Sequence, residues 1–142
     1  MSYYDHRLEE ELSKLNIQYK KLEADKHDCL VNKINKELHF SGSKISWNAL
    51  KNGISHKTDQ RSIKLISEAI KNFNEAEVIF IGDALLKDAY QIKTKYLERS
   101  LIIFSEIPQH TYFFSENLNW IGCVCTEGYI DFGEVPISNQ QK

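Results

Sequence analysis

The sequence predicts an α+β fold in which N-terminal helices pack on a mixed β-sheet of about five strands. Three observations support this prediction. The first 41 residues contain no glycine, and their apolar residues recur at helical spacing. Uninterrupted apolar runs at 78–81 and 101–104 are typical of buried strands. From residue 111 onward, aromatic and β-branched residues bounded by turn residues indicate strands.

Two helical stripes are predicted in the N-terminal region. Apolar residues from Leu8 to Leu22 step by three or four and share one face of a helix, with Asp5 as a possible N-cap. The spacing loses register at 25–28 and resumes from Cys29 to Leu38. The pattern indicates either a bend or two successive helices.

A third helical stripe runs from Ile63 to Phe73 and opens at Thr58 or Asp59. The segment before it, residues 46–53, is predicted to be a short helix capped by Ser46 and ended by Gly53. Both helices would pack on the sheet that follows.

Residues 77–104 are predicted to form one β-α-β crossover. The apolar run that ends at Gly82 would be a strand, and Asp83 would cap a helix that continues to about Glu98. The run 101–104 would be the second strand of the crossover.

The C-terminal part is predicted to be strand and turn. Strands are expected at 111–114, 119–126 and 129–135. Gly128 follows Glu127 between the last two strands and can take the positive φ of a tight turn. These two strands would therefore form a C-terminal hairpin.

Length and composition exclude several classes of protein. A chain of 142 residues is long enough for one core, so we predict a single domain over residues 1–142. With 42% hydrophobic and 27% charged residues, it has the composition of a globular protein and not of a disordered chain. No apolar run is long enough to span a membrane and no secretory signal is visible, so we expect a cytoplasmic protein without membrane contact.

Charge is unevenly distributed along the chain. Residues 1–74 carry 13 basic and 10 acidic side chains, a balance of +3, whereas residues 75–142 carry five and ten, a balance of −5. Between Ser100 and Gln141 there is no lysine or arginine, although the segment is rich in aromatic residues. An acidic, aromatic surface would repel nucleic acid and attract a basic protein. Buried aromatics with solvating acids are the alternative interpretation.

The cysteines and histidines do not predict a catalytic or metal centre. Cys123 and Cys125 are separated by one residue, and no cysteine or histidine follows them, whereas a zinc site needs four ligands with wider spacing. We therefore expect reduced, structural thiols, no metal and no cofactor. Ser105, His110 and Asp131 include the residue types of a hydrolase triad, but the sequence has no nucleophile-elbow motif.

The N-terminal lysines alternate with acidic residues, which is typical of a solvated helix face and not of a nucleic-acid-binding surface. Lys26 and Lys33 also interrupt the seam that a coiled coil would need. A monomer that does not bind nucleic acid is therefore expected.

One segment of the chain resembles a known group of proteins. The run from Pro108 to Trp120, followed by 126–133, resembles the aromatic and acidic ending of small bacterial immunity proteins from contact-dependent growth inhibition and related polymorphic-toxin systems. The resemblance covers about residues 76–134. It implies a cytoplasmic, non-enzymatic protein that binds and neutralises one cognate toxin domain, often a basic nuclease.

The resemblance and the charge pattern together predict a partner-binding surface. Its acidic residues would be Glu116, Glu127, Asp131 and Glu134, and its aromatic anchors would be Tyr112, Phe114, Trp120 and Tyr129. Two alternatives remain. One is a small hydrolase that uses His110 with a carboxylate such as Asp83. The other is a regulatory oligomer held together by the N-terminal stripe.

Overall fold

The chain folds as one seven-stranded sheet with helices on both faces, in a computed structural model that describes residues 2–38, 40–41 and 44–136. The helices are α1 (Tyr3–Lys14), α2 (Ala24–Glu37), α3 (Gln60–Lys71) and α4 (Leu97–Ser105). The sheet strands are β1 (Tyr19–Leu22), β4 (Lys51–Lys57), β5 (Glu77–Gly82), β6 (Ala89–Lys93), β7 (Thr111–Phe114), β8 (Trp120–Val124) and β9 (Tyr129–Glu134). A small hairpin, β2 (Phe40–Ser41) and β3 (Lys44–Ile45), and two 3-10 helices (Trp47–Ala49 and Thr94–Tyr96) complete the described elements.

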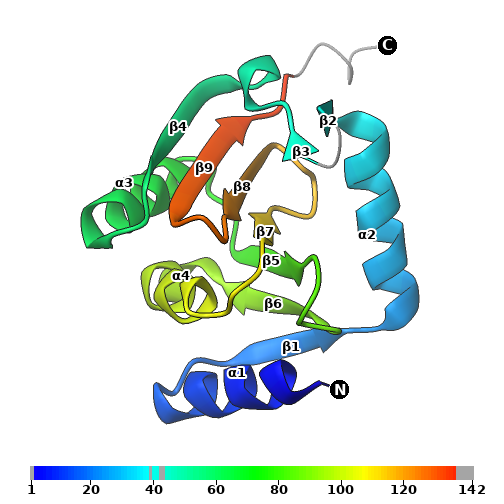
Figure 1. Ribbon diagram of the computed structural model, residues 1–142, viewed down its shortest axis with the longest axis vertical. Helices are drawn as coiled ribbons and strands as arrows, with labels where there is room; N and C mark the ends of the chain where they lie inside the picture. Colours follow the sequence, from blue (N-terminus) through cyan, green and yellow to red (C-terminus); the bar gives the residue numbers. More distant parts are fainter. Residues whose placement is uncertain (1, 39, 42–43, 137–142) are drawn as a thin grey trace.

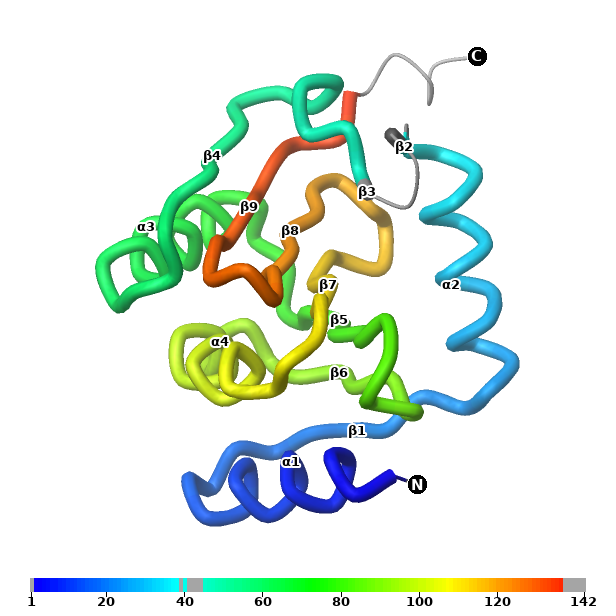
Figure 2. The backbone as a smooth tube through the Cα atoms, viewed as in Figure 1, coloured from blue at the N-terminus to red at the C-terminus, as the bar shows by residue number. Residues whose placement is uncertain are grey.

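The α+β class is confirmed, but the sheet is larger than predicted and is not mixed. Its strand order is β1-β6-β5-β7-β8-β9-β4, and every described pair is antiparallel. Figure 2 shows β1 at one edge of the sheet and β4 at the other. β1 and β4 are polar and largely exposed, so neither carries the apolar signal from which strands were predicted.

The two faces of the sheet are covered differently. Helices α1, α3 and α4 lie on one face, and α2 lies on the other with the β2–β3 hairpin (Figure 1). The core under the three helices includes the stacked rings of Phe80 and Phe104, whose centroids are 4.2 Å apart. The core under α2 is smaller and is built around Leu30, Ile34 and Phe114.

The predicted β-α-β crossover is wrong. β5 and β6 form an antiparallel hairpin, and the apolar run 101–104 lies in helix α4. The predicted strand 101–104 is helical because Leu97, Leu101 and Phe104 recur at helical spacing and all face the core. A four-residue apolar run does not by itself distinguish a buried strand from a buried helix.

Two predicted caps also differ. The first helix ends at Lys14, before the left-handed Asn16, and the rest of its predicted stripe enters β1. Its N-cap is Ser2, and Asp5 instead closes the capping box by accepting the backbone N–H of Ser2. Asp83 does not cap a helix, because the next element after it is strand β6; its carboxylate instead accepts the backbone N–H of His110.

The remaining elements agree with the sequence more closely. The helix predicted over 63–73 is α3, and Asp59 caps it by accepting the N–H of Ser62. The short helix predicted over 46–53 is limited to Trp47–Ala49, because Lys51–Lys57 is strand β4. The last three strands are β7, β8 and β9, and Gly128 has the expected positive φ of 91°. The longest described helix has 14 residues, and no helix in the described ranges has the length and apolarity of a membrane span.

Candidate functional site

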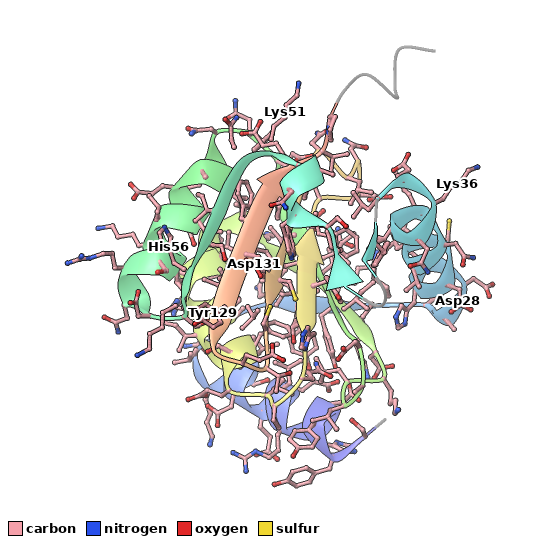
Figure 3. All side chains as sticks on the ribbon, turned by 45° about the horizontal axis from the view of Figure 1, so that its top comes forward. Asp28, Lys36, Lys51, His56, Tyr129 and Asp131 are labelled. Atoms are coloured by element: carbon pink, nitrogen blue, oxygen red, sulfur yellow. The ribbon has the colours of Figure 1, made fainter. Side chains whose placement is uncertain are left out.

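A row of side chains crosses four strands on the α2 side of the sheet. The register places Tyr112 on β7 opposite Cys123 on β8, Cys123 opposite Asp131 on β9, and Asp131 opposite Ser55 on β4. Residues directly opposite one another in an antiparallel sheet point to the same face. Figure 3 shows Tyr129 and Asp131 along β9, with β4 beside it and α2 beyond the neighbouring strands.

This row forms the floor of a hollow of about 440 Å³, here called the β-face hollow. Trp47 and Ile45 line it from the segment before β4. Tyr129 lines it from β9, with 54% of its surface exposed. Pockets of roughly 300–1,000 Å³ are large enough to hold ligands or partner side chains. The α2 helix leaves this part of the sheet uncovered, so the hollow is open to solvent.

One end of the hollow is built by three residues that meet where β7 begins and β8 ends. They are His110, Cys125 and Glu127. The His110 imidazole Nδ1 lies 2.9 Å from the Thr126 hydroxyl, and its Nε2 lies 3.6 Å from a Glu127 carboxylate oxygen. The Glu127 side chain is 56% exposed, so its charge faces the opening of the hollow.

Close contacts and burial keep the Cys123 thiol and the Tyr112 phenol of the hollow in their protonated forms. The Cys125 thiol lies 3.4 Å from the Asp131 carboxylate and 3.8 Å from the Cys123 sulfur. The contact with Cys125 and burial raise the pKa of the Cys123 thiol. Burial raises the pKa of Tyr112, which therefore remains a neutral phenol.

The lining has a negative balance of charge. Glu127 and Asp131 are its carboxylates, and among the described residues that line it none is a lysine or arginine. A second hollow, of about 490 Å³, lies on the other side of His110 and Tyr112, against the apolar residues Val31 and Ile34 of α2. His110 and Tyr112 therefore separate an acidic hollow from a more apolar one.

The structure brings together four of the eight predicted partner-binding residues. Tyr112, Glu127, Tyr129 and Asp131 all line the β-face hollow. Their convergence follows from the antiparallel pairing of β7, β8 and β9, which were themselves predicted from the sequence.

Two predicted aromatic anchors are core residues instead. Phe114 is 1% exposed and packs beneath α2, and Trp120 is fully buried on the opposite face of the sheet. The Trp120 indole N–H donates to the Glu75 carboxylate at 3.0 Å. Trp120 faces the three helices because side chains alternate along β8. Neither ring is available to a partner at the surface.

Two predicted acidic residues lie away from the hollow. Glu116 forms an ion pair with Lys26 at the start of α2. Glu134 lies at the far end of β9, where it accepts a hydrogen bond from the Asn52 amide at 2.9 Å. Both carboxylates therefore make contacts within the molecule, Glu116 with a lysine and Glu134 with an amide.

Sequence reasoning missed Ser55 and Trp47, which complete the hollow. They join it because β4 pairs with β9, and these strands lie more than 70 residues apart in the chain. No local pattern signals such a long-range pairing. The position of His110 beside Cys125 has a similar cause: His110 precedes the cysteine pair in the chain, and the pairing of β7 with β8 brings it there.

For the hydrolase alternative, the carboxylate beside the His110 imidazole is Glu127, at 3.6 Å, and not Asp83. Asp83 accepts the backbone N–H of His110 at 3.1 Å, so its described contact is with the main chain and not with the imidazole. The Ser105 hydroxyl donates to the carbonyl of Ile102 within α4. No family model, curated protein or solved structure matches the chain.

Proposed function

We propose that this chain is a non-enzymatic immunity protein, which binds and neutralises a cognate toxin domain by holding a basic segment of that domain in the β-face hollow. The observation that carries the proposal is the lining itself, in which Glu127 and Asp131 lie among Tyr112, Tyr129 and Trp47 with no described lysine or arginine beside them. Nuclease domains, which bind phosphate, present basic surfaces of the kind that such a hollow attracts.

The two kinds of side chain would contribute differently to binding. The exposed carboxylate of Glu127 would accelerate the approach of a cationic surface, and this effect weakens as salt rises. Tyr129 and Trp47 are rigid rings that can pack against an arginine guanidinium or a lysine stem. The partner would thus be recognised by its charge and held by packing.

The proposal includes a place of action and a state. The chain would act in the cytoplasm, as a monomer, with no cofactor needed for binding the toxin. It would bind neither nucleic acid nor membrane, because the carboxylates of the hollow repel phosphate groups.

The test is affinity capture from the native host lysate, with the purified chain as bait at low and high salt. One bait carries Glu127→Lys and Asp131→Asn in the hollow. The matched control carries Glu68→Lys and Glu106→Gln, which give the same change in charge at exposed positions on α3 and after α4. We expect a basic partner at one-to-one stoichiometry on the wild type and the control, and association slowed by at least about 10-fold in the hollow variant.

A second step separates binding from immunity. The captured protein is expressed alone and together with this chain, and growth of the cells is followed. Arrested growth that is rescued by co-expression supports the immunity function. A partner without toxicity would refute that function, and equal capture by the hollow variant and the control would refute the use of the hollow.

A further inference from the structure

His110, Cys125 and Glu127 place one nitrogen, one sulfur and one oxygen ligand atom within 4.8 Å of one another. The three residues come from the start of β7, the end of β8 and the turn that follows β8. Two backbone hydrogen bonds shape that turn. The Cys125 N–H donates to the Tyr129 carbonyl at 2.7 Å, and the Gly128 N–H donates to the Cys125 carbonyl at 3.1 Å. The hairpin thereby directs Glu127 toward the histidine.

The distance between His110 and Glu127 is within the range of an ion pair but longer than a hydrogen bond. Nε2 and the carboxylate oxygen are 3.6 Å apart, which is too long for a hydrogen bond between nitrogen and oxygen. With zinc bond lengths of about 2.0–2.2 Å and tetrahedral angles, a nitrogen and an oxygen on one ion lie roughly 3.4 Å apart. The separation therefore matches two ligands of a single ion.

The imidazole is held in the orientation that a metal ligand needs. Its Nδ1 lies 2.9 Å from the Thr126 hydroxyl, which can accept the Nδ1–H and leave the lone pair on Nε2. The backbone of His110 is fixed as well. Its N–H donates to the Asp83 carboxylate, and its carbonyl accepts the N–H of Asp83 at 3.0 Å.

We propose that His110 Nε2, the Cys125 thiolate and a Glu127 carboxylate oxygen bind one divalent transition-metal ion such as Zn²⁺. A mixed nitrogen, sulfur and oxygen donor set suits borderline ions of this kind, whereas Ca²⁺ and Mg²⁺ prefer oxygen ligands alone. Cys125 binds as the thiolate, and its proton passes to solvent. The three ligand residues line the β-face hollow, so water from the hollow could complete the coordination.

The surrounding charges favour a cation at this point. Asp131 lies 3.4 Å from the Cys125 sulfur, so a second carboxylate adjoins the three ligands. The Cys123 sulfur lies 3.8 Å from that of Cys125 but is only 2% exposed, so Cys123 is the buried thiol against which the role of Cys125 is compared. Both proposals use Glu127, but metal binding is measured on the purified chain without a partner, so the two proposals can fail separately.

The test uses the full chain, stripped of metal and reduced, and titrated with Co²⁺ as the spectroscopic probe. We expect saturation at one equivalent, a thiolate-to-cobalt charge-transfer band and the visible bands of tetrahedral Co²⁺, all removed by added Zn²⁺. Cys125→Ser should abolish the charge-transfer band. His110→Gln and Glu127→Gln should each weaken Co²⁺ binding by about 10-fold or more.

Cys29→Ser and Cys123→Ser are the controls, and both should retain the bands. Glu127 is exposed, so its amide variant tests the site without disturbing the core, and circular dichroism verifies that every variant folds. Three results would overturn the site. They are the absence of saturable Co²⁺ bands in the wild type, bands that disappear with Cys29 or Cys123 instead of Cys125, or wild-type affinity in both the histidine and glutamate variants.

Discussion

The two faces of the sheet differ in how they are covered and in what they can do. Under α1, α3 and α4, alternate residues such as Ile130 and Phe132 on β9 belong to a continuous apolar core. On the other face of the same strand, Tyr129 and Asp131 point into the open hollow. One strand therefore contributes one set of residues to the core and the other set to the hollow in which we propose that a partner binds.

The attachment of the helices shows the same contrast. Helix α3 buries Ile63, Ile66 and Ile70, whereas α2 buries only Leu30 and Ile34 within its length. The stability of the fold should therefore reside on the three-helix face, and changes in the hollow should alter binding without unfolding the protein.

The largest effect is expected from Trp120→Ala. The ring is fully buried between Phe113 and Phe132, and its indole N–H bonds Glu75. Removing it leaves a cavity and takes from the Glu75 carboxylate one of its two described donors, the other being the Asn119 amide. The free energy of unfolding should therefore fall by about 3–5 kcal/mol in urea denaturation.

Tyr129→Ala is the matched change on the open face, because Tyr129 is 54% exposed. It should alter the free energy of unfolding by less than about 0.5 kcal/mol. Equal destabilisation by the two variants would contradict the division of labour between the faces.

A smaller effect is expected from Asp5→Asn. The Asp5 side chain joins α1 to the loop before β6. The buried Asp5 carboxylate accepts the backbone N–H groups of Lys87 and Asp88 and the Tyr90 hydroxyl. An amide would direct its NH₂ group at some of these donors. We expect a loss of about 2 kcal/mol at pH 7, measured against Glu10→Gln, an exposed change on the same helix.

The loss should depend on pH. Burial raises the pKa of Asp5, but the hydrogen bonds that it accepts, first of all from Ser2, lower the pKa by more than burial raises it. The pKa in the folded state therefore lies below the ordinary 3.8. The carboxylate therefore contributes its full stability above pH 3.8, and that stability is lost as the pH falls through the folded pKa. The gap between wild type and Asp5→Asn should accordingly shrink at low pH, and a constant gap would contradict this explanation.

The sequence was informative where local chemistry decides the structure. Asp59 caps α3, and the apolar stripe from Ile63 faces the core as predicted. β7, β8 and β9 were predicted from aromatic and β-branched runs. The tight turn between β8 and β9 was predicted because Gly128 can take a positive φ. These signals lie within a few residues of one another along the chain.

The sequence failed where long-range packing decides between alternatives. Residues 89–93 were predicted to lie in a helix that continues to about Glu98, but they form strand β6, which pairs with β5. The candidate site has the same limit. Tyr112, Glu127, Tyr129 and Asp131, predicted from the resemblance and the charge pattern, line one hollow. The face on which Trp120 lies depends on a register that spacing alone does not show.

Gly128→Ala should have a modest effect, since the hollow depends on the hairpin turn. The φ of 91° is unfavourable for a residue with a Cβ, although an added Cβ would meet no atom within 4 Å. We expect a loss of about 1 kcal/mol from backbone strain alone, measured by urea denaturation. Gly53→Ala is the control, because its φ is not positive and its added Cβ would lie at an ordinary 3.7 Å from the carbonyl oxygen of Phe132. A larger loss at Gly53 than at Gly128 would contradict the strain argument.

The smallest effect is expected from Glu116→Gln, which removes the ion pair between α2 and the loop before β8. The side chains of Lys26 and Glu116 are 44% and 58% exposed, and the hydrogen bond from Lys26 lowers the pKa of Glu116. Solvent screens such a pair, so the free energy of unfolding should fall by about 0.5 kcal/mol or less, and high salt should remove the difference.

Hydrogen exchange makes the same variant more informative. Because α2 is held by a small apolar contact and this surface pair, its amides should exchange faster than those of α3 in the wild type. Glu116→Gln should accelerate exchange in α2 while leaving α3 unchanged. If both helices responded equally, α2 would open only when the whole molecule unfolds, and the two faces of the sheet would form a single cooperative unit.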